Sequence, residues 1–432
     1  NIYIDASLVA TAATFNLSMQ AVGSIFSTTA NTVINLPFAG LSLSAGADVL
    51  VQGPKSFSLN TFDIVAGGNV SIDALGGFAS ISAIQGLSVV AGQDIAVAGG
   101  SVSLASTNGT INLSAGRNIS LVSAAMSAFS SVALDAGAQI LLQGGSIAAS
   151  DINISTTGAI SASPLIDPLN SSPLVHSVAT RGGTLLDASG GNITISSPGS
   201  QSHNGSTIIS SSGNVSISSS SPTAGPSDLT GVTIDASGAI SIDSASDLTI
   251  NSSTISPSDP SGNIAASVSI TSGGTLSLIG SQSYSDGPVL IQGLGPDALD
   301  PSVRLQDVVL DSSGSGITIK GAQTVQVESI SGNAGLQAFS NILIEGGSTV
   351  LVNITNPSLS YQISSTSGGV TIDIDPLSSY TTNRNVFLQS SSSFVDLYGL
   401  LGVDVGAYAT LAQAANFNVS GGPGAQFVLG NN

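Results

Sequence analysis

The chain contains no cysteine and no tryptophan among its 432 residues, and only 4% of its residues are aromatic. Without cysteine, neither disulfides nor thiolate metal sites contribute to the fold. With so few rings, the interior has to be filled by the aliphatic side chains of Ile, Val, Leu and Ala. Such a core is thin, so we expect one extended architecture instead of several globular domains.

Charged residues are also scarce, at 7% of the chain, and 25 acidic residues against 6 Lys and Arg give a formal net charge of −19. This excess of acid excludes nucleic acid and anionic membranes as partners. The apolar fraction of 41% is too high for a disordered chain. The most apolar late stretch, residues 397–415, is interrupted by Asp404, so we expect no membrane span.

Long helices are disfavoured, because Gly, Ser, Thr and β-branched residues dominate every part of the chain. A short repeat is present instead, with the pattern Ala-Gly-x-[Asp/Asn/Gln]-[Ile/Val]-x-aliphatic. One copy begins every 21 to 25 residues, at Ala45, Ala66, Ala91, Ala115 and Ala136. The alternation of apolar and polar residues within each copy is typical of a strand with one buried face.

A related motif, Gly followed by a strand such as Asn-Ile-Thr-Ile, begins at Gly191, Gly213, Gly238 and Gly274. The last two copies are 36 residues apart, which we interpret as a loop inserted into one repeat, since Pro257 and Pro260 lie between them.

Short strands at this spacing, separated by glycines able to adopt positive φ at corners, predict an all-β fold: a right-handed parallel β-helix with loop insertions in its second half. An antiparallel sandwich is the alternative. It requires hairpin turns such as Asn-Gly, and these occur only at Asn108 and Asn204. Stacking one repeat per coil predicts a polar column of Asp48, Asn69, Asp94, Asn118 and Gln139. It also predicts a buried aliphatic ladder that includes Ile72, Ile95, Val97, Ile119, Leu121, Ile140, Ile193, Ile195, Val215, Ile217, Ile240 and Ile242.

Proline divides the chain, because 13 of its 16 prolines lie between residues 161 and 376. We expect compact coils over residues 1–160, coils with Pro/Ser-rich loops over 161–386, and an aromatic-rich cap or subunit contact over 387–432. The loops are expected at residues 161–183, 196–205, 218–228, 256–263 and 284–301.

Candidate sites are few. Thirteen Asn-x-Ser/Thr sequons occur, partly because the repeat itself resembles one, and we single out for N-glycosylation Asn69, Asn118, Asn170, Asn204 and Asn214. The only two histidines, His176 and His203, fall in segments expected to be loops, with no nucleophile pattern beside them. Asp373 and Asp375 share one strand face, as acidic groups of polysaccharide hydrolases do, but we expect a solvated face. We therefore expect no catalytic residue, no cofactor and no metal.

Aromatic residues gather toward both ends of the chain. An open solenoid exposes unpaired strand edges and apolar core at each end, so these rings either cap the last coils or contact a neighbouring subunit. The candidates for such a contact are Tyr3, Phe15, Phe26, Phe387, Phe394, Tyr398, Tyr408, Phe417 and Phe427. Head-to-tail contact of this kind generates a fibre.

The Ala-Gly-x-[Asp/Asn]-Ile-x-Leu repeats, with Asp187-Ala188-Ser189-Gly190 and Asp235-Ala236-Ser237-Gly238, resemble those of filamentous-haemagglutinin-type exoproteins and related adhesins. The resemblance covers about residues 40–280 and does not include that family's amino-terminal secretion domain. It implies an extracellular or cell-surface β-helix shaft, with cell-surface glycans or receptors as partners. A non-enzymatic fibre subunit or adhesin shaft is the expected function, and a carbohydrate-binding or polysaccharide-degrading β-helix is the alternative. The chain begins at Asn1 without a methionine, as a processed or internal segment does.

Overall fold

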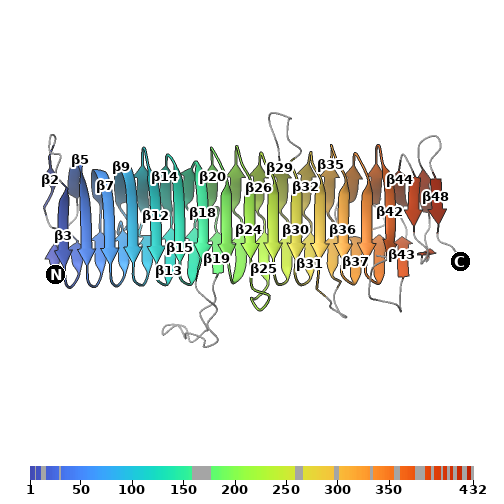
Figure 1. The fold of residues 1–432 in the computed structure, drawn as a ribbon, viewed down its shortest axis with the longest axis horizontal. Helices are drawn as coiled ribbons and strands as arrows, with labels where there is room; N and C mark the ends of the chain where they lie inside the picture. The colour runs from blue at the N-terminus through green and yellow to red at the C-terminus, as the bar shows by residue number, and fades with distance from the viewer. Residues whose placement is uncertain are drawn as a thin grey trace. The chain divides into compact units, whose positions relative to one another are not determined.

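The computed structural model of the protein describes residues 1–4, 6–10, 16–28, 31–157, 177–257, 266–295, 301–330, 334–354, 361–374, 385–390, 394–399, 402–405, 409–411, 416–420 and 426–429. The described residues form strands and turns but no helix, and the strands pair in parallel (Figure 1). The chain forms two compact units, Asn1–Gly213 and Asn214–Asn432. The predicted parallel β-solenoid is confirmed.

Each coil of the first unit passes through three parallel stacks of strands, which we name the A, B and C faces. The A face contains β1 (Ile2–Tyr3), β4 (Ile25–Ser27), β6 (Val49–Gln52), β8 (Val70–Asp73), β10 (Ile95–Ala98), β13 (Asn118–Val122), β16 (Gln139–Gln143), β19 (Ser177–Arg181) and β22 (Ser200–Asn204). The B face contains β2 (Leu8–Val9), β11 (Ser101–Ser106), β14 (Ala124–Ala128), β17 (Ser146–Ala149), β20 (Leu185–Ala188) and β23 (Thr207–Ser210). The C face contains β3 (Leu17–Ala21), β12 (Thr110–Ala115), β15 (Ser131–Ala136), β18 (Asp151–Thr156) and β21 (Ile193–Ser197). Three longer strands run through the B and C faces without a break: β5 (Thr32–Ala45), β7 (Lys55–Ala66) and β9 (Phe78–Ala91).

The second unit has the same three kinds of stack. Its A face contains β25 (Ser227–Thr230), β28 (Leu248–Asn251), β31 (Leu276–Ile279), β34 (Val303–Gln306), β37 (Thr324–Ser329), β40 (Thr349–Ile354), β43 (Asn385–Ser390) and β46 (Ala409–Leu411). Its B face contains β26 (Thr233–Ala236), β29 (Thr254–Pro257), β32 (Gln282–Ser285), β35 (Val309–Ser312), β38 (Gly335–Ala338), β41 (Tyr361–Ser365), β44 (Phe394–Gly399) and β47 (Asn416–Ser420). Its C face contains β24 (Val215–Ser219), β27 (Ile240–Ser244), β30 (Val268–Ser272), β33 (Val289–Gly293), β36 (Ile317–Gly321), β39 (Ile342–Gly346), β42 (Gly369–Ile374), β45 (Gly402–Val405) and β48 (Gln426–Leu429).

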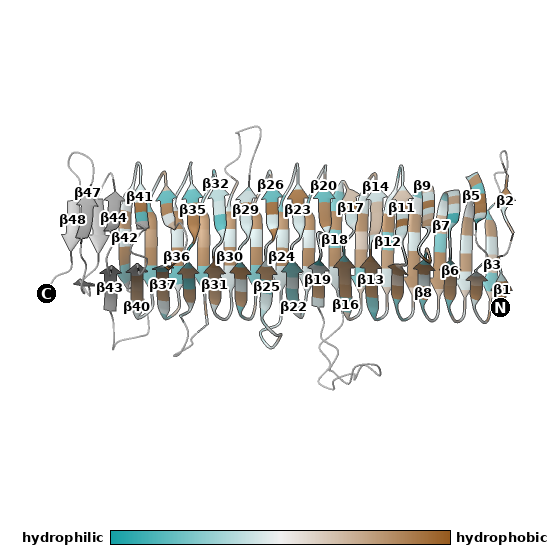
Figure 2. Ribbon diagram, turned by 180° about the vertical axis from the view of Figure 1, so that it is seen from behind, coloured by the Kyte–Doolittle hydropathy of each residue, from teal (hydrophilic) through white to brown (hydrophobic). Residues whose placement is uncertain are grey.

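The core of each unit is a ladder of aliphatic side chains. Inward and outward residues alternate along the strands, as the period of two requires, so that Val-x-Leu and Ile-x-Ile pairs point inside. All twelve positions predicted for the ladder are buried. Figure 2 shows hydrophobic segments recurring in one strand after another. Among the residues whose burial is described, Phe57 and Phe62 are fully buried in the core, and their rings meet edge to face at 5.9 Å.

The corner between the A and B faces depends on left-handed backbone. In coil after coil, a residue of positive φ lies within two residues of the end of the A-face strand, where the chain turns sharply. Glycine adopts this conformation at little cost, whereas other residues pay about 1 kcal/mol or more. The corner residues are Gly53, Leu75, Gly99, Ser123, Gly144, Gly182, Gly205, Gly231, Ser252, Gly280 and Asp307.

The glycine of the Ala-Gly repeat has a different role from the one expected. It lies at the corner between the C and A faces, and its φ is not positive. Consecutive repeat glycines instead stack so closely that a Cβ on Gly92 would lie 2.2 Å from the carbonyl oxygen of Gly67. Gly116 and Gly137 meet the same obstacle in the coils that follow. Glycine is therefore required here by the close approach of neighbouring backbones, and the positive φ expected of corner glycines is found at the corner between the A and B faces.

The two repeat motifs belong to different faces. The Ala-Gly copies lead into the A-face strands β6, β8, β10, β13 and β16, whereas the motifs at Gly191, Gly213 and Gly238 lead into C-face strands. The motif at Gly274 leads back into the A face, at β31. The 36 residues between Gly238 and Gly274 therefore separate motifs on two different faces. On the A face alone, Leu248 pairs with Leu276, so successive coils there are 28 residues apart.

Several segments expected to be loops contain strands. The range 161–183 contains β19, the range 196–205 contains β22, and the range 284–301 contains β33. Proline and serine marked these segments as loops, but inward-facing polar side chains are accommodated within the strands. The prediction for residues 218–228 is confirmed over residues 220–226, which connect β24 to β25. Within the remaining predicted loops, residues 161–176 and 258–263 lie outside the described residues.

Many serines are buried and bind neighbouring coils together. In the second unit, Ser285 Oγ donates to the carbonyl oxygen of Ala266 at 2.6 Å, and Ser312 Oγ donates to that of Gly287 at 2.8 Å. Ser253 and Ser281 make equivalent bonds to Leu229 and Ile250 at another corner. A buried hydroxyl needs such a partner, so serine is a structural residue of these corners.

Candidate functional site

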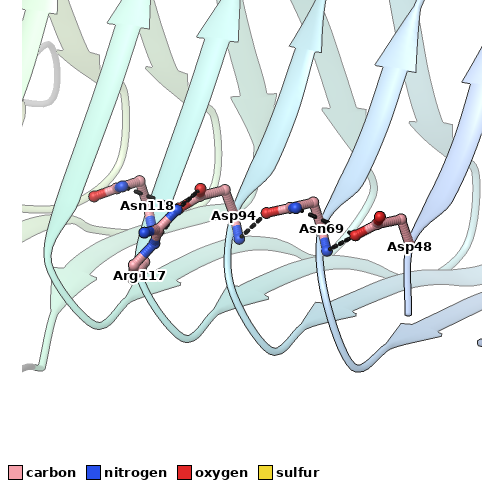
Figure 3. A network of polar contacts seen from close by, with 5 residues as sticks. All are labelled: Asp48, Asn69, Asp94, Arg117 and Asn118. Atoms are coloured by element: carbon pink, nitrogen blue, oxygen red, sulfur yellow. Dashed lines mark hydrogen bonds and ion pairs between the residues drawn. The ribbon is translucent and has the colours of Figure 1, made fainter. Parts of the chain in front are cut away.

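The predicted polar column exists at the corner between the C and A faces of the first unit (Figure 3). Asp48 Oδ1 accepts from the backbone N–H of Asn69 at 2.7 Å and from its Nδ2 at 3.2 Å. Asn69 Oδ1 accepts in turn from the backbone N–H of Asp94 at 3.2 Å. Asp94 Oδ1 accepts from the backbone N–H and Nδ2 of Asn118, and Asn118 is in register with Gln139. The sequence prediction of this register is confirmed.

The column begins earlier than the repeat. Ser24 donates its backbone N–H to Asn1 Oδ1 at 2.9 Å, and Ser24 Oγ accepts from the N–H of Asp48 at 3.3 Å. These two residues precede A-face strands but lack the Ala-Gly motif, so the motif search missed them. In the sequence, these two positions are marked only by the hydrophobic pairs that follow them, Ile-Tyr and Ile-Phe, which indicate the start of a strand.

Arg117 adds the one charge pair of the column. Its Nε donates to Asp94 Oδ1 at 3.1 Å, and its second guanidinium nitrogen reaches Asp94 Oδ2. Carboxylates alternate with amides along the column, so no two like charges are adjacent. These bonds, each from a side-chain oxygen of one coil to the backbone N–H of the next, fix the coils in register.

The same hydrogen bond, from a backbone N–H to a side-chain oxygen of the preceding coil, recurs at other corners. Within the first unit, Asp151 Oδ1 accepts from the N–H of Asn192 at 2.9 Å. Within the second unit, Asn214, Asp247 and Asn341 accept from the N–H groups of Ala239, Thr275 and Gly369 at 2.7, 2.8 and 2.9 Å. A side chain of one coil that binds the backbone of the next is therefore a general element of this chain.

The sequons divide into two groups. Asn69 and Asn118 are half-buried, and their side-chain amides donate within the polar column. Asn204 and Asn214 are exposed, although Asn214 also accepts a backbone hydrogen bond. Asn170 lies outside the described residues. Exposure therefore favours Asn204 as the acceptor of a glycan, and its modification stays a prediction.

The terminal aromatics are described only in part. Tyr3 and Phe26, from adjacent A-face strands, stack at 5.2 Å with an interplanar angle of 21°, and Tyr3 is 62% exposed. Phe15 and Tyr408 lie outside the described residues. The other candidates fall on strands: Phe387 on β43, Phe394 and Tyr398 on β44, Phe417 on β47 and Phe427 on β48.

His203 is not a loop residue, and this expectation is wrong. It lies on β22 with its side chain fully buried in the core. Ser206 Oγ donates to Thr180 Oγ1 at 2.7 Å, which leaves the Thr180 hydroxyl to donate to His203 Nδ1 at 2.8 Å. His203 Nε2 then donates to Gln201 Oε1 at 3.2 Å. Burial lowers the pKa of His203 to about 4, because the core does not solvate an imidazolium.

The other candidate chemistry is sparse. His176 and Asp375 lie outside the described residues, and Asp373 is half-buried on β42, in register with Glu345. Among the described residues, no group of three or more His, Cys, Asp and Glu side chains is arranged to hold a metal ion. The part of the chain that the structure describes also contains no helix of the length and hydropathy that a membrane crossing requires.

A depression lies on the B face of the second unit, with a volume of ≈ 240 Å³. Its lining comes from four successive B-face strands and the residue before one of them: Tyr284, Val309, Leu310, Asp311, Ala334, Gly335, Leu336, Gln337 and Gln362. Register places Tyr284, Asp311 and Gln337 side by side in one row. Tyr284 is 40% exposed, and its hydroxyl donates to Gln282 Oε1 at 3.1 Å.

Asp311 is the carboxyl group at the centre of that row. Its pKa is raised, first because partial burial disfavours the carboxylate and second because Asp286 adds a nearby negative charge. No Lys, Arg or His belongs to the lining. The depression therefore combines an exposed ring, amides and one carboxyl group in an environment that repels anions.

No family model, curated protein or solved structure matches this chain.

Proposed function

We propose that this protein is a non-enzymatic structural protein of the cell surface or extracellular space, serving as a fibre subunit or adhesin shaft. The observation that carries the proposal is the polar column of the first unit, in which the same bond from side chain to backbone recurs from Asn1 to Asn118. A repeated link of this kind stiffens the stack of coils, which is the property that a shaft or fibre requires.

The composition of the coils supports the same proposal. Buried serines bond one coil to the next, and stacked glycines let neighbouring backbones approach closely. Both residue types therefore have a structural role in the stack of coils. The resemblance of the Ala-Gly-x-Asp repeats to filamentous-haemagglutinin-type exoproteins also favours a surface shaft.

Self-association is part of the proposal. Residues near 1–30 of one subunit would meet residues near 387–432 of the next in a head-to-tail contact, which does not close and therefore generates a fibre. Tyr3, Val9 and Val22 support this contact, because their apolar side chains are exposed on the first coil. Strand edges next to exposed apolar side chains are favourable places for another chain to add.

Electron microscopy and light scattering of the full chain test the proposal. We expect rods whose length and mass increase with protein concentration. Val22→Asp should shorten these rods, because a carboxylate would be placed in the contact. Phe129→Asp is the matched control, since Phe129 is an exposed ring on a later coil of the same unit. Its rods should be as long as those of the unmodified protein.

A monodisperse monomer at high concentration would contradict the fibre. Deletion of residues 387–432 provides a second test, since it should abolish growth if the carboxyl-terminal segment forms half of the contact. Rods that grow equally well in the Val22→Asp and deletion variants would show that the contact lies elsewhere.

A further inference from the structure

The depression on the B face of the second unit is lined almost entirely by strand residues. Two rows of outward-facing residues cross β32, β35, β38 and β41 at right angles to the strands. One row consists of Gln282, Val309, Gly335 and Gln362, and the other of Tyr284, Asp311 and Gln337. Neighbouring members of a row are about 5 Å apart, so three coils span about 10 Å, close to the length of a disaccharide.

Gly335 forms the floor of the depression. It occupies a strand position without positive φ, so its backbone conformation does not require glycine. A Cβ at this position would come within 3.3 Å of the carbonyl oxygen of Gln362 and would begin to fill the hollow. The missing side chain leaves room between Val309 and the exposed amide of Gln362, the two neighbours of Gly335 in its row.

Tyr284 supplies an aromatic surface beside this hollow. Its hydroxyl reaches Gln282, two residues earlier on the same strand, so the ring leans along the B face instead of projecting into solvent. One side of such a ring packs on the protein, while the other is free for an apolar patch of a ligand. A sugar ring offers a patch of this kind on its C–H face.

The polar groups around the hollow match hydroxyl groups. Gln337 and Gln362 each offer both a donor and an acceptor, and half-buried Asp311 offers acceptors. A ligand rich in hydroxyls satisfies both kinds of group at once. The lining contains no cationic side chain, and Asp286 adds negative charge nearby, so anionic sugars, phosphates and sulfates are disfavoured.

We propose that this depression binds a neutral oligosaccharide, with one sugar ring stacked on Tyr284 and its hydroxyls bound by Asp311, Gln337 and Gln362. The site is a binding surface on the proposed shaft. It does not depend on fibre formation, so either proposal can fail without the other.

A glycan array that displays neutral and uronic-acid oligosaccharides, followed by calorimetry with the neutral oligosaccharide that binds best, tests the proposal on the full chain. We expect a neutral oligosaccharide to bind in the high-micromolar to millimolar range. Tyr284→Ala should weaken binding at least about tenfold, because the stacking surface is lost. Gly335→Leu should abolish measurable binding by filling the hollow. Phe129→Ala removes an exposed ring in the first unit and should leave binding unchanged.

Circular dichroism establishes whether each variant is folded. If Gly335→Leu does not fold, Gln337→Ala replaces it, and we expect weaker binding because one amide partner is lost. Three results would overturn the proposal: no binding to any neutral oligosaccharide on the array, equal affinity in Tyr284→Ala, or a preference for uronic-acid oligosaccharides over neutral ones.

Discussion

Protonation of His203 should destabilise the first unit as the pH falls. The core accepts the neutral imidazole, which has a pKa of about 4 in the folded protein, whereas an exposed histidine titrates near 6.5. Between these two values the unfolded chain binds more protons than the folded chain. The free energy of unfolding therefore decreases as the pH falls from about 6.5 toward 4.

The hydrogen bonds explain why the neutral form is held. Ser206 donates to Thr180, Thr180 donates to His203 Nδ1, and His203 Nε2 donates to Gln201. A proton on Nδ1 would turn this acceptor into a donor and leave two donors facing each other in the core. The shift corresponds to about 3 kcal/mol in full, of which about 2 kcal/mol is lost between pH 7.5 and pH 5.0.

Urea unfolding followed by circular dichroism at pH 7.5, 6.0 and 5.0 measures this loss. The His203→Gln variant is the comparison, because glutamine stays neutral over the whole range. The difference in unfolding free energy between the two proteins should change by about 2 kcal/mol from pH 7.5 to pH 5.0. Measurements stop at pH 5.0, because the chain approaches its isoelectric point of ≈ 4.1 below it.

Nuclear magnetic resonance provides an independent readout, since the chain has only two histidines. The imidazole signal that is missing in His203→Gln should remain that of a neutral ring at pH 5.0. A signal that titrates near pH 6.5 would refute the reasoning. So would a difference in stability between the two proteins that does not vary with pH.

Three further substitutions test the corners of the first unit by urea unfolding. Asp94→Ala should lower the free energy of unfolding by about 1–2 kcal/mol, because it removes the acceptor for Asn118 and Arg117. Asp94→Asn keeps an acceptor and should lower it less. Equal losses in the two variants would contradict a hydrogen-bonding role. Gly92→Ala should lower the free energy of unfolding by about 1–3 kcal/mol, because its Cβ would collide with the Gly67 carbonyl. Gln93→Ala, at the next residue, is the control and should be close to neutral. An unchanged urea midpoint in Gly92→Ala would show that the coils do not approach so closely. Ser123→Gly should raise the free energy of unfolding by about 1 kcal/mol, because glycine adopts the left-handed backbone of this position without strain. Ser127→Gly, within β14, should lower it by about 0.5–1 kcal/mol. A change of the same sign in both variants would rule out relief of backbone strain at Ser123.

The local pattern was sufficient to predict the architecture and the polar column. Alternation with a period of two decides which side chains point inward, and a repeat of near-constant length aligns equivalent residues in successive coils. Asp48, Asn69, Asp94 and Asn118 were therefore predictable neighbours, although they are far apart in sequence. Both signals lie within single repeats, so they needed no knowledge of distant contacts.

Other features were decided by tertiary structure. Proline and serine near His203 indicated a loop, yet the imidazole is buried, because Thr180 from the preceding coil and Ser206 complete its hydrogen bonds. Polar residues at inward positions hide a strand from a search for apolar alternation, and only the neighbouring coil shows that His203 is hydrogen-bonded.

The B-face depression depends on tertiary structure in the same way. Tyr284, Asp311 and Gln337 come from three coils, and they become neighbours only because the intervening segments return to the same face in register. A single added or deleted residue in a strand would turn one of these side chains inward. The sequence alone determined that strands stack in parallel coils; which side chains meet across coils was decided by the length and turns of each coil, since those set the register.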